Sequence, residues 1–175
     1  MMLIATAMVM MGGGILNYLK LLRKAHFNTN KILQYYYRWR IKHYRDRFGL
    51  EIKPDSSIGY GLYLGHPYNI TINKHAIIGN NCNIHKGVVI GQENRGKRKG
   101  APIIGNSVWI GINAAVVGGI TIGDDVLIAP NSYVNCDVPS HSVVIGNPCV
   151  IKHREMATEC YINNKVEEYT TTDQK

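Results

Sequence analysis

The sequence lacks the cysteine patterns that indicate a zinc site or a disulfide framework. It has four cysteines, no C-x-x-C pair, and no Cys and His spacing that suits zinc. We therefore expect no metal. Cysteines this few and scattered are usually reduced thiols of a cytoplasmic protein, and we expect that location for this chain.

The N-terminus lacks the features of a secretory signal. Met1–Leu16 is apolar, but no basic residue precedes the apolar run and no obvious cleavage site follows it. A run of about 16 residues, interrupted at Gly12–Gly14, is short for a membrane span. We expect an extra start segment or the first turns of a packed helix. Weak, peripheral contact with a membrane is the alternative.

Acidic residues are scarce. Asp and Glu number 12 against 20 Lys and Arg, so the net charge is +8. Such an excess predicts an anionic partner: a phosphorylated cofactor, an acidic glycan, a membrane surface or nucleic acid. The charge alone does not choose among them.

Proline is absent from 17–48, where apolar residues follow a rough helical spacing. Asn28–Asn30 is the predicted break and N-cap between two helices. The block Tyr35–Arg40 is aromatic and basic, which is compatible with a nucleic-acid or membrane surface. The favoured interpretation is that its rings pack on the first β-coil while its arginines face water.

What the sequence does contain is a six-residue repeat through its C-terminal two-thirds. Aliphatic residues recur mostly six apart, at Ile58, Leu64, Ile72, Ile78, Ile84, Ile90, Ile104, Ile110, Val116, Ile122, Ile128 and Val134. Neither an α-helix nor an ordinary strand has this period, but a coil of three short strands does. The pattern predicts a mainly β protein, a parallel β-helix of hexapeptide repeats. Glycines that follow the aliphatics are expected to supply corner geometry.

Two interruptions divide the repeats. Two residues are added near Ile70–Thr71, and a longer excursion, Gln92–Pro102, carries a run of Lys and Arg. We expect an N-terminal helical segment at 1–49, the β-helix at 50–152 and a tail at 153–175. Because the ends of a β-helix are open edges, both appendages are predicted to cap it.

Two histidines occupy positions that favour chemistry. His66 lies between glycine and proline just before the first insertion, and His85 lies one coil later. Adjacent coils are about 4.8 Å apart, so both side chains are expected on one face. A lone histidine is usually structural or simply exposed. The setting of His66 favours a functional role instead, and that of His85 favours one less strongly.

At this point the residues resemble a known family. Glu51–Pro54 and Ile58–His66 are similar to the entry coil of the serine acetyltransferases, which belong to the hexapeptide acyltransferase superfamily. Val88–Gly91, Val108–Gly111 and Gly146–Pro148 are similar to its later coils. The resemblance covers about 100 residues, from Glu51 to Ile151.

The resemblance implies a left-handed β-helix, a homotrimer, acetyl-CoA as donor and a site between neighbouring subunits. His66 takes the place of the catalytic base, and histidine suits that role because its pKa lies near working pH. Glu51 takes the place of the carboxylate that orients the base. His85 is the further catalytic candidate.

The resemblance also implies a groove for the donor. The excursion lies beside it, so its cations are candidates for the phosphates of CoA or for an acidic glycan, and a solvated loop is the equal alternative. The predicted cofactor-binding residues are Gly91, Lys97, Arg98, Ala114, Ala129, Pro130 and Lys152.

Departures from the family bear on the acceptor. Gly65 stands where the family has an acid before the histidine, and Gly100–Ala101 stands where it has an Arg-His pair. Without these groups serine is expected to bind poorly. The sequence therefore favours O-acetylation of a sugar in surface polysaccharide synthesis, with serine O-acetylation as the alternative. A basic nucleic-acid- or membrane-binding protein, or a scaffold, is the alternative of another class; nucleic acid is not the expected partner.

Overall fold

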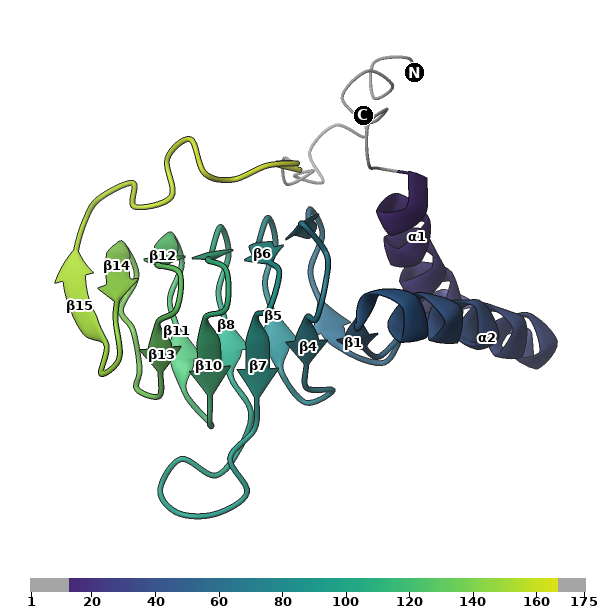
Figure 1. The fold of residues 1–175 in the computed structure, drawn as a ribbon, viewed down its shortest axis with the longest axis horizontal. Coiled ribbons are helices and arrows are strands. Elements are labelled where there is room, and N and C mark those ends of the chain that lie inside the picture. Colours follow the sequence, from purple (N-terminus) through teal and green to yellow (C-terminus); the bar gives the residue numbers. More distant parts are fainter. Residues whose placement is uncertain (1–12, 167–175) are drawn as a thin grey trace, which may run out of the picture.

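The computed structural model describes residues 13–166 as a helical hairpin joined to one end of a β-helical rod (Figure 1). The hairpin consists of α1 (Gly13–Phe27) and α2 (Lys31–Phe48). The expectation for Met1–Leu16 falls mostly outside the described residues, although Gly13–Leu16 is already helical. Within the described part, no helix is long and apolar enough to cross a membrane.

The hairpin forms where the sequence predicts it. Asn30 is the N-cap of α2, and its side chain accepts hydrogen bonds from the N–H groups of Ile32 and Leu33. Gly49 ends the helix in the left-handed conformation, with φ of 65°. On α1, Tyr18 is buried and donates a hydrogen bond to the carbonyl of Ile52, which joins the hairpin to the first coil.

The predicted packing of the aromatic block is largely wrong. Only Tyr37 of the block packs against the core; Tyr35, Tyr36 and Trp39 are exposed. The reason is the helical period: Tyr37 lies on the face of Ile41 and Phe48, whereas the other three rings lie on the opposite face.

The rod is built from three parallel sheets. Sheet A contains β1 (Glu51–Ile52), β4 (Thr71–Ile72), β7 (Val89–Gly91), β10 (Ala115–Val117) and β13 (Tyr133–Val134). Sheet B contains β2 (Ser57–Ile58), β5 (Ile77–Ile78), β8 (Ile103–Ile104) and β11 (Thr121–Ile122). Sheet C contains β3 (Tyr63–Gly65), β6 (Asn83–His85), β9 (Trp109–Ile110), β12 (Val126–Ile128), β14 (Ser142–Ile145) and β15 (Val150–His153), the last antiparallel.

The register along sheet A confirms the repeat and both interruptions. Glu51 pairs with Thr71, 20 residues on; Thr71 pairs with Val89, 18 on; Val89 pairs with Ala115, 26 on. Three hexads make 18 residues, so the steps of 20 and 26 residues contain the two insertions. The aliphatic of each hexad points inward, and nearly all of these side chains are buried.

The expected role of the glycines is wrong. Gly59, Gly79 and Gly105 do not have positive φ; the left-handed corners are taken mostly by other residues, among them Asn81 and Asn113. The glycines are needed instead because the coils stack closely. A Cβ at Gly59 would lie 2.5 Å from the carbonyl oxygen of Gly79, and one at Gly79 2.5 Å from that of Gly105.

The C-terminal end differs from a simple cap. β15 covers the edge of sheet C, and the chain then turns back along the rod as an extended tail, 154–166, rather than covering the end (Figure 1). Asp125 holds this tail by accepting hydrogen bonds from the N–H of Ala157 and from the N–H and hydroxyl of Thr158. Asn83 and Asn81 hold it further along.

Candidate active site

The two predicted histidines meet on the outer face of sheet C. Gly65 in β3 pairs with His85 in β6, and His66 follows at an exposed corner with φ of 48°. The imidazole of His85 lies directly over Gly65, where an added Cβ would collide with its ring. His85 can therefore take this position only because residue 65 has no side chain.

His85 belongs to an aromatic stack that the sequence did not reveal. Its ring centroid lies 4.7 Å from that of Trp109 in β9, and Trp109 lies 5.4 Å from Tyr161 of the tail. The repeat does predict that the side chain of Trp109 points outward, because Trp109 occupies the same place in its hexad as Asn83. Tyr161 has no sequence signal, because only the return of the tail brings it here.

The surroundings of His85 keep its imidazole neutral. Burial lowers the pKa of His85, and the charge of His66 lowers that pKa further. The Nε2 atom of His85 is buried and has no hydrogen-bond partner among the described residues. Buried ring nitrogens without a partner are rare, which marks His85 as a candidate functional residue. His66, by contrast, is exposed at the corner, where an acceptor hydroxyl can approach it.

Glu51 lies elsewhere on the first coil. Its side chain is exposed on the outer face of sheet A and lines a cleft of about 1070 Å³ between that sheet and α2. In the described part of the chain, no hydrogen bond or ion pair joins Glu51 to His66. The connection is through the backbone, since the Glu51 N–H donates to the carbonyl of Ile70, four residues after His66. The orienting role of Glu51 stays a prediction.

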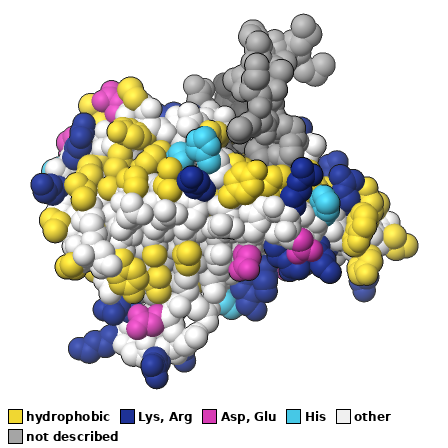
Figure 2. Space-filling view, in the orientation of Figure 1, with side chains coloured by type: hydrophobic (Ala, Val, Ile, Leu, Met, Phe, Trp, Pro, Cys, Tyr) yellow, Lys and Arg dark blue, Asp and Glu magenta, His cyan; other side chains and the backbone are white. Residues whose placement is uncertain are grey.

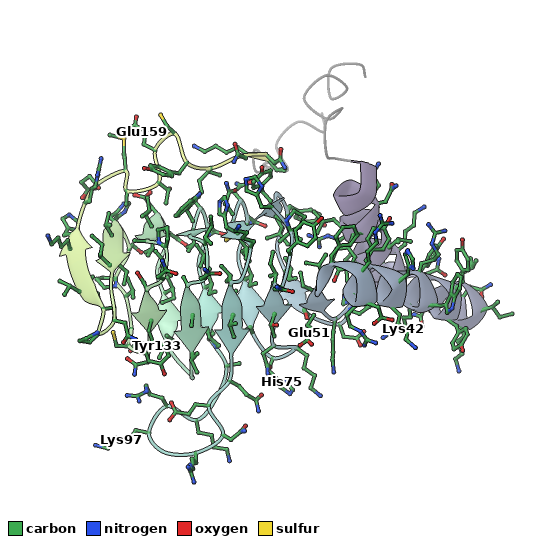
Figure 3. All side chains as sticks on the ribbon, in the orientation of Figure 1. Lys42, Glu51, His75, Lys97, Tyr133 and Glu159 are labelled. Carbon is green, nitrogen blue, oxygen red and sulfur yellow. The ribbon has the colours of Figure 1, made fainter. Side chains whose placement is uncertain are left out.

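The cleft beside Glu51 is strongly basic. Figure 3 shows Glu51, His75 and Lys42 near the junction of the β-helix and α2. The cationic side chains that line the cleft come from both sides of that junction: Arg38, Lys42, Arg45, Lys53 and Lys74. Arg38 is paired with Asp55 at 2.9 Å. The cleft is suited to anions more than to a neutral ligand.

The predicted cofactor residues are dispersed within one chain. Lys97 and Arg98 lie on the long loop between β7 and β8, which projects from the rod (Figure 3), and Gly91 lies at its base. Arg98 forms an ion pair with Glu93 at 3.3 Å. Ala129 and Pro130 follow β12, and Lys152 is exposed on β15.

Ala114, another predicted cofactor residue, lies inside the β-helix. Its side chain is fully buried, its N–H donates to Gly111, and its carbonyl accepts from Val89. The six-residue repeat explains this, because the fourth position of this hexad points into the core. The cofactor-binding role of Ala114 stays a prediction.

Comparisons with known proteins agree with this architecture. Residues 101–136 match the family described as bacterial transferase hexapeptide (six repeats). The chain is 38% identical over 99 residues to a serine acetyltransferase of Helicobacter pylori, covering 57% of this chain and 58% of the relative. It is 37% identical over 106 residues to one of Synechococcus elongatus, covering 61% and 43%. The chain thus spans about half the length of the curated relatives it matches.

Solved structures match a larger share of this chain. Soybean serine acetyltransferase complexed with serine superimposes with a TM-score of 0.66 at 29% identity, over 77% of this chain and 56% of that one. The Neisseria gonorrhoeae enzyme in complex with serine gives 0.64 at 34% identity, over 77% and 55%. Serine acetyltransferase from Brucella abortus gives 0.68 at 26% identity, over 79% and 56%.

These findings define the class of the rod: it is a left-handed parallel β-helix of hexapeptide repeats, and its residues 101–136 match the bacterial transferase hexapeptide family. Within that class, the relatives and structural neighbours named above are serine acetyltransferases, and these are the proteins that the chain resembles. The fold and the family resemblance expected from the sequence are both confirmed.

Proposed function

We propose that this chain is an acetyl-CoA-dependent O-acetyltransferase. The observation that supports this most is the placement of the two histidines. His66 is exposed at a corner of the first coil, directly after Gly65, and Gly65 pairs with the neutral His85 of the next coil. The relatives of this β-helix are named serine acetyltransferases. General-base activation requires an imidazole that the acceptor hydroxyl can reach, and the exposed His66 meets that condition.

The proposed reaction follows from that arrangement. His66 removes the proton of the acceptor hydroxyl while the oxygen attacks the carbonyl carbon of the acetyl thioester. The tetrahedral intermediate then expels the thiolate of CoA, which takes the proton back from the imidazolium and leaves as a thiol. His85, with its unpartnered Nε2, is placed to bind the acceptor or the intermediate beside His66.

Acetyl-CoA fits the chain as a donor because exposed cations lie on the loop beside sheet A. Lys97 and Lys99 are both exposed, whereas Arg98 is engaged with Glu93. The two free ammonium groups are the proposed partners of the CoA phosphates. The trimer implied by the resemblance would bring a neighbouring rod to this loop, and we propose that assembly as well.

The relatives favour L-serine as the acceptor, and we propose serine as the first substrate to test. This reverses the preference that the sequence departures gave. A sugar hydroxyl is the second candidate, and one observation favours it. The ring of His85 fills the space that a side chain at position 65 would need. This position therefore offers no substitute for the acidic group that the serine acetyltransferases have there.

The test is an acceptor screen with purified full chain and acetyl-CoA, in which free CoA thiol is detected. Serine, nucleotide sugars and glycan fragments are compared, each with wild type and with His66→Ala. Serine-dependent thiol release that vanishes in His66→Ala supports the serine proposal. Release with sugars alone supports the second candidate, and no acceptor-dependent release with any hydroxyl would overturn both.

A further inference from the structure

The net positive charge of this protein comes from the helical hairpin. Nine of the 20 Lys and Arg residues lie between Gly13 and Leu50, with Asp46 as the single acid. The rest of the chain holds the other 11 basic residues and 11 acidic ones, so its net charge is zero. The hairpin therefore carries the whole excess of +8.

The outer face of α2 is apolar and aromatic in its N-terminal half, between Ile32 and Trp39. Ile32 is 80% exposed, Tyr35 76% and Trp39 61%, and Phe27 at the end of α1 is 63% exposed. Ile32, Tyr36 and Trp39 follow one another at steps of four and three, so they form one stripe along the helix. Figure 2 shows hydrophobic side chains and Lys and Arg together at the hairpin end of the molecule.

Cations flank this stripe on both sides. At 100° per residue, Lys31 and Lys42 fall on one flank of the stripe, and Arg40 and Arg47 fall on the other. The opposite face of α2 is engaged, because Tyr37, Ile41 and Phe48 pack against the core. The stripe is therefore not the packing face of the helix, and the described part of the chain does not cover it.

A helix with an outward apolar and aromatic stripe between two basic flanks matches the interface of an anionic bilayer. Tyr and Trp prefer the headgroup level, apolar residues enter the acyl boundary, and Lys and Arg meet anionic headgroups. The sequence Met1–Met11, outside the described residues, contains no acidic side chain to oppose this. We propose that the outer face of α2, together with Phe27, docks on an anionic membrane surface.

Two other partners fit less well. A second hairpin would bring two faces of like charge together, which costs energy unless counter-charges intervene. Nucleic acid would meet Ile32 and Phe27 as the most prominent groups, and neither offers a hydrogen bond or charge to phosphate. Both alternatives are outcomes that the test distinguishes.

The experiment is co-sedimentation of the full chain with vesicles of phosphatidylcholine and of phosphatidylcholine mixed with phosphatidylserine. We expect binding to the mixed vesicles that weakens as salt rises, and little binding to neutral ones. The double variant Ile32→Ser/Trp39→Ser should lose roughly tenfold or more in affinity, as should Lys31→Gln/Lys42→Gln. All four residues are exposed, and unchanged circular dichroism and melting verify the fold.

Matched controls lie outside the hairpin, on β15 and the tail. Val150→Ser/Met156→Ser removes two apolar side chains that are 56% and 62% exposed, and Arg154→Gln/Lys165→Gln removes two exposed cations; neither should change vesicle binding. A chain without residues 1–11 should keep its preference for anionic vesicles. In a Trp109→Phe background, the fluorescence of Trp39 alone should shift to the blue on binding.

Several results would overturn the proposal. One is equal binding of the stripe variant and wild type to anionic vesicles; another is loss of binding on removal of residues 1–11 alone. Association of hairpins that the stripe variant abolishes, without vesicle binding, would identify a second copy as the partner. Salt-sensitive binding to DNA or RNA without vesicle binding would identify nucleic acid.

Discussion

At the scale of single residues, the candidate site depends on how two histidines differ. His66 is exposed at a corner, whereas His85 is half-buried against Trp109 and has its pKa lowered, first by burial and then by His66. The exposed imidazole is the one that an acceptor hydroxyl can reach, and the half-buried one is suited to act as a neutral hydrogen-bonding partner.

Substitution separates the two roles. His66→Ala should lower turnover by about 10²–10⁴-fold, the usual contribution of a general base. His85→Ala should lower it less and act mainly through KM. His43→Ala, an exposed histidine on α2, is the matched control and should keep the wild-type rate. If His85→Ala alone abolished turnover, the assignment of the base would be reversed.

The lowered pKa of His85 has a measurable consequence. Its imidazole should titrate below 6.5 in an NMR experiment, and Trp109→Ala should bring the pKa back up by exposing the ring. Because the folded state favours the neutral form, the stability that His85 contributes is complete above pH 6.5 and falls as the pH drops below it. A titration at or above the ordinary value would show that the ring is more hydrated than the structure indicates.

At the scale of elements, the tail is part of the candidate site. Burial alone would raise the pKa of Asp125, but its hydrogen bonds with Thr158, His141 and Ala157 outweigh burial and lower it. The same contact, first of all the hydrogen bond with Asp125, raises the pKa of His141. Through Asp125 the β12 coil therefore holds the segment that carries Tyr161 to Trp109.

Asp125→Asn should loosen this tail. Losing a charged acceptor costs roughly 1.5–3 kcal/mol per hydrogen bond, so hydrogen exchange of 157–166 should speed up by about tenfold or more. Glu159→Gln, on the same tail but exposed, is the control. The stability that ionised Asp125 contributes is lost as the pH falls through its lowered pKa. The stability that protonated His141 contributes is lost as the pH rises through its raised pKa. Unchanged exchange in Asp125→Asn would contradict the anchoring role.

The loop between β7 and β8 provides a second test at this scale. Neutralising Lys97 and Lys99 should weaken acetyl-CoA binding more than binding of the dephospho form, if the loop contacts the 3′-phosphate. Arg98 is left intact because its contact with Glu93 holds the loop. Calorimetry with both donors decides the matter, and equal weakening would indicate general electrostatics or contact with the acceptor.

At the scale of the whole molecule, the rod presents flat sheets with apolar side chains outward. Ile77 and Ile103 of sheet B and Val89 of sheet A are among them. Surfaces of this kind are usually covered in an assembly. We expect a trimer by sedimentation equilibrium, with acetyl-transfer activity that falls on dilution into monomers. A fully active monomer would contradict a site shared between subunits.

The β-helix was determined by the sequence itself, because the hexad is a local rule: each aliphatic must point inward wherever its coil lies, and insertions simply lengthen corners. The N-cap at Asn30 and the positions of His66 and His85 on one face follow from equally local rules.

Only the tertiary structure decided the rest. The contact of Tyr161 with Trp109 joins residues 52 apart, the glycines are required by the backbone of the next coil, and Tyr35 and Trp39 face outward because Tyr37 took the packing face. Each of these depends on what a distant segment occupies, which no short-range pattern contains.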